Sequence, residues 1–114
     1  MTKNELLQTL NTEPKSISFD DVISVIDSEY VFTPSEFKNG NLINAAGENS
    51  GSCKIFAFAH LQKLTKEETL NCFGDYYRID VLENPDDNNH QNIRNFMATG
   101  WNGITFTNTP ITKK

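Results

Sequence analysis

The segment from Ser50 to Leu64 limits what this chain can fold into more than any other stretch. Apolar or small residues recur in it at the i, i+3, i+4 spacing of a helix face: Cys53, Phe56, Ala57, His60, Leu61 and Leu64. Ile55, Phe58 and Ala59 make the reverse side apolar as well. A helix that is apolar all round is normally buried, so we expect a central helix with the other elements packed around it.

The overall composition predicts one small, soluble globular domain. The chain has 114 residues, of which 37% are hydrophobic and 22% are charged, as in ordinary globular proteins. Its formal charge of −5 disfavours nucleic-acid binding, because phosphate backbones repel an acidic protein. No apolar run reaches the roughly 18 residues that a membrane helix needs. The start of the chain lacks the pattern of a signal peptide, so we expect a cytoplasmic site of synthesis without membrane association.

Capping residues predict where several helices begin. Thr2 with Glu5, and Thr65 with Glu68, have the spacing of a capping box, in which a hydroxyl and a carboxylate satisfy free backbone N–H groups. Ser18 is an N-cap for a second helix. Further along, Asp75 is predicted to cap a short helix that runs to Leu82, and a last helix after residues 86–89 is predicted to end at Gly100.

Short strands are predicted between these helices. Residues 30–33 are β-branched or aromatic and precede a proline, and residues 104–107 alternate in polarity. Asn39-Gly40 is a strong hairpin signal and would place Phe37 opposite Leu42. Residues 110–114 are expected to form a tail. The predicted fold is α+β: a mostly helical domain of about five to six helices around a buried central helix, with a small antiparallel sheet.

Motifs along most of the chain resemble the HopJ type III effector family. In order they are Phe32-Thr33-Pro34, Phe37-Lys38-Asn39-Gly40, Asn44-Ala45-Ala46-Gly47, Gly51-Ser52-Cys53-Lys54, residues 73–78, residues 90–97 and Gly100-Trp101. The resemblance extends from about Phe19 to Pro110 and implies a single HopJ-like domain over residues 1–114. It implies an effector or effector-related bacterial protein that a type III system can secrete, and it implies no defined reaction.

Cys53 is the best candidate for a nucleophile. Ser50 or Ser52 can cap the central helix, which would place the thiol in the first turn, where the positive end of the helix dipole favours a thiolate. The sequence therefore allows a cysteine-dependent hydrolase or transferase as an alternative function. The competing interpretation is that Cys53 is a buried apolar residue, as most free cysteines are.

A cysteine nucleophile needs a histidine as base and a third group that orients the histidine. His60 lies two turns further along the same helix face, about 10 Å away, which is too far for a hydrogen bond. His90 is the other histidine and the candidate base, with Asn92 or Asp87 as the orienting group.

A polar and aromatic cluster indicates a binding surface. Tyrosines offer stacking area with a polar tip, and arginines offer a fork for carboxylate or phosphate. The candidate binding residues are Asp75, Tyr76, Tyr77, Arg78, His90, Arg94 and Asn95. The alternative is that these residues have structural roles, in which Asp75 caps a helix, the tyrosines pack in the core and the arginines form internal ion pairs. Our primary interpretation is a protein that acts by binding a host or bacterial protein, or a small ligand.

No metal or cofactor is expected. The run from Asp86 to His90 is rich in oxygen ligands, but Gln91 and Met97 stand where a calcium-binding EF-hand loop needs Gly and Glu. The two cysteines and two histidines lack the paired spacing of a zinc site.

Overall fold

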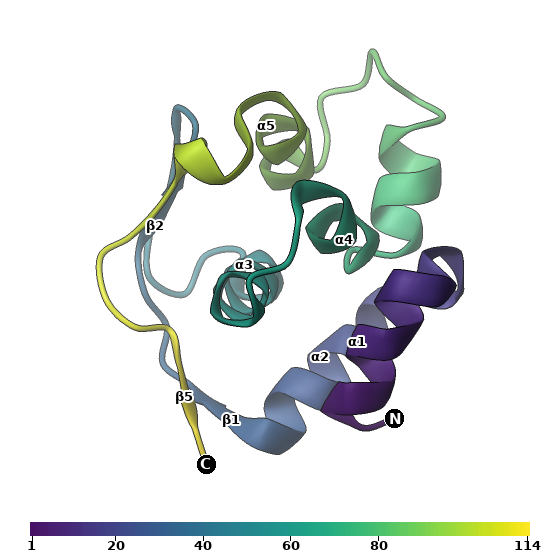
Figure 1. The fold of residues 1–114 in the computed structure, drawn as a ribbon. Coiled ribbons are helices and arrows are strands. Elements are labelled where there is room, and N and C mark those ends of the chain that lie inside the picture. Colours follow the sequence, from purple (N-terminus) through teal and green to yellow (C-terminus); the bar gives the residue numbers. More distant parts are fainter.

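The computed structural model describes residues 1–114 and places α3 (Ser50–Gln62) at the centre of the fold, as predicted (Figure 1). Phe56 and Phe58, on opposite sides of α3, are both fully buried. The other α-helices pack around it: α1 (Lys3–Thr12), α2 (Phe19–Glu29), α4 (Lys66–Asn71) and α5 (Gln91–Thr99). The strands cover the remaining side (Figure 1). The α+β prediction with a mostly helical domain is confirmed.

The last turn of α3 departs from the predicted burial. His60 is exposed and Leu61 is 51% exposed, although both belong to the predicted inner face. Lys63 takes a left-handed conformation with φ of 57° and ends the helix, so this last turn lies at the edge of the core. His60 instead packs at the surface against Trp101, with ring centroids 5.6 Å apart.

Capping boxes begin three of the helices. The side chains of Thr2, Ser18 and Thr65 each accept a hydrogen bond from a backbone N–H three residues later, at 3.0 to 3.1 Å. In each case the acidic side chain at that third residue accepts the N–H of the capping residue in return. These bonds satisfy donors that the helix itself leaves free, and the predicted starts are confirmed.

Two small antiparallel sheets complete the fold. In one, β1 (Tyr30–Phe32) pairs with β5 (Ile111–Lys113). In the other, the strand order is β3 (Leu42–Asn44), β2 (Phe37–Asn39) and β4 (Ile104–Phe106). The expectation of a tail after residue 110 is therefore wrong. Ile111 is buried to 1% exposure, and this burial holds β5 against the core.

The hairpin forms, but its register differs from the predicted one. Phe37 pairs with Asn44, and Asn39 pairs with Leu42, so the turn residues are Gly40 and Asn41. Gly40 has φ of +62°, which suits the first position of a tight hairpin turn. Asn39 stays in the strand because its side chain is fully buried and hydrogen-bonded to Asn92.

After α4 the chain turns directly into η2 (Tyr76–Val81), a π-helix. Gly74 makes this turn with φ of +61°, and a Cβ there would lie 2.7 Å from the backbone nitrogen of Phe19. Asp75 makes no side-chain cap, contrary to prediction, and its carboxylate lies 3.8 Å from Arg78. The carbonyl oxygen of Gly74 instead accepts the backbone N–H groups of Tyr77 and Arg78.

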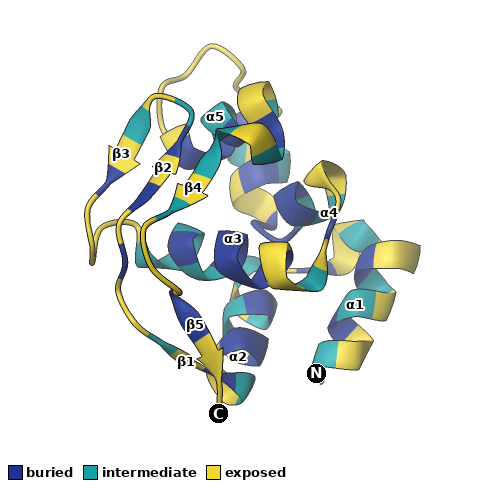
Figure 2. Cartoon of the chain, turned by 60° about the vertical axis from the view of Figure 1, so that its left-hand side comes forward, coloured by how far each residue is buried: buried dark blue, intermediate teal, exposed yellow.

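The buried residues form one continuous core. Figure 2 shows them on the facing sides of the helices and strands, while the loop between η2 and α5 is exposed throughout. The core is rich in aromatic rings, and Phe56 contacts the rings of Phe37, Phe73, Phe96 and Trp101. The chain contains no helix that is both long and apolar enough to cross a membrane.

Candidate functional site

The starts of α3 and α5 meet at a surface hollow of about 410 Å³, which we call the His90 hollow. It also reaches the first turn of α2, Leu42 of β3, and Phe73 and Tyr76 at the turn into η2, so segments from distant parts of the chain form it. Its lining includes Phe19, Asn49, Ser52, Tyr76, His90 and Asn92. No carboxylate and no lysine or arginine lines it.

Aromatic rings form one wall of the His90 hollow. Tyr76 is 45% exposed, and its ring lies 5.2 Å from those of both Phe19 and His90. The ring of Phe19 fits against the start of α3 because Gly51 has no side chain, since a Cβ there would lie 2.8 Å from the tip of that ring. An exposed ring held between two others offers a flat stacking surface of fixed position.

His90 is oriented by a carboxylate. Its Nε2 lies 3.0 Å from Oδ2 of Asp80, which belongs to η2. The other ring nitrogen, Nδ1, has no hydrogen-bond partner within the protein. When Nε2 carries the proton that Asp80 accepts, Nδ1 of the neutral ring is a hydrogen-bond acceptor; when the ring is protonated, Nδ1 is a donor.

Both helix starts at this hollow lack side-chain caps. Asn49 and His90 occupy the N-cap positions in left-handed conformations, with φ of 51° for each. Neither side chain accepts a hydrogen bond from its helix. The first N–H groups of α3 and α5 therefore stay available at the wall of the hollow, at the positive end of each helix dipole.

Three buried asparagines fix the start of α5 to the hairpin. The amides of Asn92 and Asn44 exchange hydrogen bonds of 3.1 and 3.0 Å, and Asn39 donates to the carbonyl oxygen of Asn92 at 2.7 Å. Oδ1 of Asn39 has no partner. These residues come from separate parts of the chain, and no spacing in the sequence links them, so sequence reasoning missed the network.

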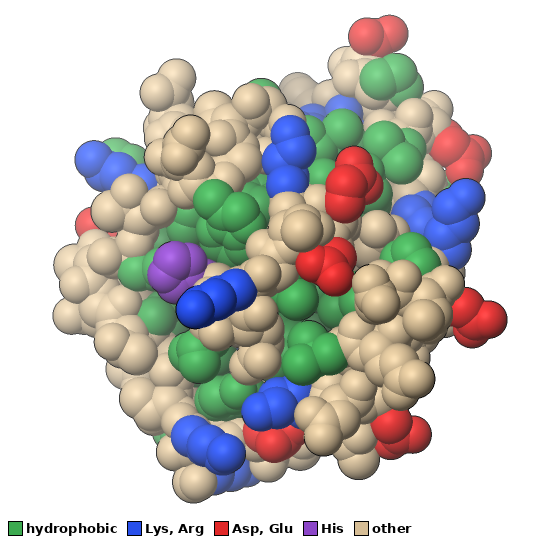
Figure 3. Space-filling view, in the orientation of Figure 1, with side chains coloured by type: hydrophobic (Ala, Val, Ile, Leu, Met, Phe, Trp, Pro, Cys, Tyr) green, Lys and Arg blue, Asp and Glu red, His purple; other side chains and the backbone are tan.

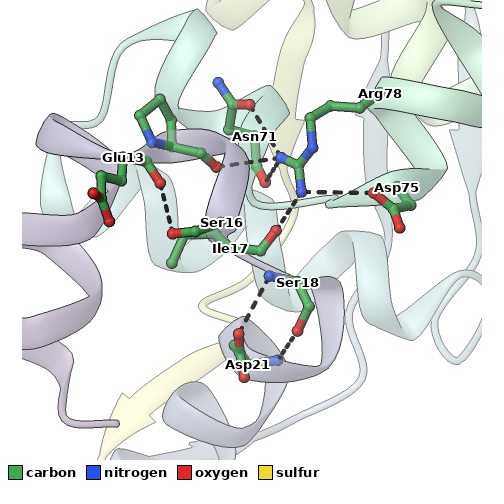
Figure 4. A network of polar contacts seen from close by, with 9 residues as sticks. Glu13, Ser16, Ile17, Ser18, Asp21, Asn71, Asp75 and Arg78 are labelled. Atoms are coloured by element: carbon green, nitrogen blue, oxygen red, sulfur yellow. Dashed lines mark hydrogen bonds and ion pairs between the residues drawn. The ribbon is translucent and has the colours of Figure 1, made fainter.

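Arg78 is turned toward the protein rather than toward a ligand. Its guanidinium donates to the carbonyl oxygens of Pro14 and Ile17 and, at 3.2 Å, to Oδ1 of Asn71 (Figure 4). Only 15% of its side chain is exposed. Because its N–H groups donate to carbonyl oxygens, Arg78 links η2 to the connection between α1 and α2. Tyr77, beside it, is buried with 7% exposure.

Arg94 and Asn95 also make internal contacts. Arg94 donates to the carbonyl oxygens of Asn84 at 3.0 Å and Asn89 at 2.6 Å, and so holds the loop before α5. Asn95 donates to the carbonyl oxygen of Asn39 at 3.1 Å. Of the predicted binding residues, the structure therefore brings Tyr76 and His90 together at a hollow and engages the two arginines and Asn95 elsewhere.

Cys53 lies in the core and does not line the hollow. It is 1% exposed, and its thiol donates to the carbonyl oxygen of Ser35 at 3.8 Å. Burial raises the pKa of Cys53 to about 11, which outweighs the helix-start effect that favours a thiolate. No hydrogen bond joins Cys53 to His90, and the amide of Asn92 belongs to the asparagine network. The geometry gives the nucleophile hypothesis no support.

The loop between η2 and α5 shows no sign of metal binding. Asp86 and Asp87 are both exposed. Nowhere in the chain do three side chains of His, Cys, Asp or Glu come together as metal ligands would.

Comparison with known proteins assigns the family. No curated protein matches the chain at a significant level. A crystal structure described as that of the unknown function protein VPA0580 is 53% identical, with a TM-score of 0.98, and the match covers 100% of this chain and 95% of that chain. The pattern of the HopJ type III effector protein family matches residues 3–111, so the likeness includes α1, beyond the motifs noted above. The chain belongs to the HopJ type III effector protein family.

Proposed function

We propose that this HopJ protein works by binding, and that it holds a small planar molecule with a carboxylate or phosphate group in the His90 hollow. The observation that carries the proposal is the exposed ring of Tyr76 beside His90, at the point where two uncapped helix starts meet. A ligand ring would stack on Tyr76, and its acidic group would accept hydrogen bonds from the helix starts.

The chemistry of the lining supports this class of ligand. No carboxylate side chain lines the hollow, so nothing there repels an anion directly. The hydroxyl of Ser52 adds a neutral hydrogen-bonding group, whereas the side-chain amides of Asn49 and Gln91 already donate to Oδ1 of Asn44 and to the carbonyl oxygen of Asn88. Aromatic and aliphatic side chains beside several polar groups are a usual combination in small-molecule sites.

The proposed site is narrower than the surface predicted from the sequence. Arg78 and Arg94 already donate to backbone carbonyl oxygens, so we assign them to holding the two segments that carry Tyr76 and His90. The Asp80–His90 pair then sets the direction of the imidazole within the hollow.

Family membership supports delivery of this protein through a type III secretion system. We propose that it is exported by that route and binds its ligand at the destination. A fusion to a reporter enzyme that needs a host cofactor tests this step. Signal should appear in host cells only when the bacterium carries a working secretion apparatus; equal signal without the apparatus would exclude the route.

The binding proposal is tested with phenyl phosphate as probe, titrated into ¹⁵N-labelled protein. The expected result is a saturable shift of the backbone amide signals of Gly51, Ser52 and Gln91. Benzylamine, which has the same ring with a positive charge, should cause no such shift. Shifts spread over the whole surface, or equal shifts with benzylamine, would overturn the proposal.

Single substitutions show whether phenyl phosphate binds in the His90 hollow. Tyr76→Ala removes the stacking surface and should weaken phenyl phosphate binding about fivefold, since stacking contributes about 1 kcal/mol. Tyr76→Phe should keep most of the affinity. His60→Ala is the matched control, because His60 is an exposed histidine that also packs on an aromatic ring but lies outside the hollow.

A further inference from the structure

The outer surface of η2 is unusually apolar for an exposed helix. Ile79 is 46% exposed and Leu82 is 47% exposed, and Tyr76 stands one turn before Ile79. Tyr77 and Val81 face the core instead. Figure 1 shows this helix, in light green, on the outside of the fold at the right, with no element covering it. We call the surface formed by Tyr76, Ile79 and Leu82 the η2 ridge.

A second hollow continues the η2 ridge toward α5. It measures about 340 Å³, and Val81, Leu82, Pro85 and Met97 supply its apolar walls. Arg94 also lines it, with its guanidinium donating to the backbone carbonyl oxygens of Asn84 and Asn89. A hollow of this kind beside an exposed apolar ridge can receive an apolar side chain of a partner. Anchoring of one or two such side chains is how protein interfaces gain most of their affinity.

Acidic side chains surround the η2 ridge. The segment from residue 75 to residue 87 contains five carboxylates, namely Asp75, Asp80, Glu83, Asp86 and Asp87, and a single arginine, Arg78. Arg78 is turned inward onto carbonyl oxygens, and one lysine, Lys15, lines the adjoining hollow on the other side of η2. Figure 3 shows acidic, basic and hydrophobic side chains together on this edge of the molecule.

We infer that the η2 ridge is a docking surface for a basic amphipathic helix of a partner protein. An amphipathic helix would place apolar residues at i, i+3 and i+4 on Ile79, Leu82 and the adjoining hollow. Its lysines and arginines would then face the carboxylates around the ridge. The excess of carboxylates in residues 75–87 disfavours acidic partners and anionic lipid surfaces. The inference does not require ligand binding in the His90 hollow, although Tyr76 belongs to both surfaces.

The probe is a peptide of about 14 residues that repeats leucine and lysine at helical spacing, with a fluorescent label. It should bind the protein with saturable anisotropy, and added salt should weaken the binding because ion pairs contribute. Backbone amide signals of residues 76–83 should shift in the ¹⁵N spectrum. A peptide with glutamate in place of lysine should not bind.

The double variant Ile79→Ser/Leu82→Ser should lose about tenfold or more in peptide affinity. Val31→Ser/Ile43→Ser is the matched control, because these two side chains are 51% and 59% exposed on the strands. Equal loss in both variants, or no loss in the η2 variant, would overturn the inference. So would self-association of the protein that the Ile79→Ser/Leu82→Ser change abolishes, because the ridge would then bind a second copy. Phenyl phosphate binding should stay unchanged in the η2 variant, which separates the two proposals.

Discussion

The imidazole of His90 lies 3.0 Å from the carboxylate of Asp80, and this contact joins η2 to the start of α5. The pair fixes which ring nitrogen faces the His90 hollow. Asp80→Ala should therefore weaken phenyl phosphate binding by about threefold to tenfold, the equivalent of one hydrogen bond of about 0.5 to 1.5 kcal/mol. Asp80→Asn keeps an oxygen acceptor for Nε2 of His90 and should lose less of the affinity for phenyl phosphate. Titration of the two variants by calorimetry gives the comparison. If both bind as the natural protein does, His90 does not depend on Asp80.

Arg78 should be essential for stability. Its inward guanidinium donates to Pro14, Ile17 and Asn71, and bonds from a charged donor contribute more than neutral ones. We expect Arg78→Ala to lower the free energy of unfolding by about 2 to 4 kcal/mol, with the loss measured by urea denaturation. Arg78→Lys should recover little of this, because an ammonium cannot reproduce the fork. Exposed Lys38→Ala is the control and should change stability little. If Arg78→Ala leaves the free energy of unfolding unchanged, this arginine is not needed for stability and is available to bind a ligand.

Substitution of Asn92 should destabilise the protein nearly as much as substitution of Arg78. It is 6% exposed, and its amide bonds both Asn44 and Asn39. Asn92→Ala leaves those two amides short of partners in the core and should cost about 2 to 3 kcal/mol of unfolding free energy. The exposed Asn102→Ala serves as the control. Hydrogen exchange at the start of α5 offers a second measurement, and unchanged exchange there would show that the network does not hold this helix.

Features that depend on neighbouring residues were predictable from the sequence. A capping box needs only a hydroxyl and a carboxylate three residues apart, so Thr2, Ser18 and Thr65 mark their helices without further information. The burial of the centre of α3 was equally predictable, because a helix that is apolar on all sides is normally buried. The exposure of the last turn of α3 was not predictable, since it depends on Lys63 ending the helix at the edge of the core.

Features that depend on distant residues were not predictable. Arg78 meets carbonyl oxygens of Pro14 and Ile17, and a carbonyl oxygen is present at every position, so it leaves no signature in the sequence. The same holds for the hairpin register, which the contact between Asn39 and Asn92 helps to set across 53 positions. The predicted binding cluster contained Tyr76 and His90, which line one hollow, but the sequence could not tell which side chains of that cluster point outward.

Cys53 should resist alkylation in the folded protein. Burial raises its pKa to about 11 and that of Cys72 to about 12, so at neutral pH both stay protonated. Iodoacetamide should modify neither cysteine in native protein, and both in urea, as mass spectrometry can follow. A Cys72→Ala variant isolates the behaviour of Cys53. Rapid native labelling of that variant would restore the nucleophile hypothesis.

The same two thiols should make the protein less stable in alkali. Their pKa values lie near 9.0 before burial and rise to about 11 and about 12 on folding, so the folded state keeps protons that the unfolded state releases. Each protonated thiol contributes to the free energy of unfolding. This contribution is fully present below about pH 9 and is lost as the pH rises toward the folded pKa, by up to about 1.4 kcal/mol per pH unit.

Urea denaturation across this alkaline range measures that slope. The double variant Cys53→Ala/Cys72→Ala starts less stable, because the core loses two sulfur atoms, but its stability should fall less steeply with pH. Lysines and tyrosines titrate in both proteins, so the difference between the two slopes isolates the thiols. Parallel slopes would mean that the cysteines ionise as readily in the folded protein as in the unfolded chain, and that α3 does not exclude solvent from Cys53.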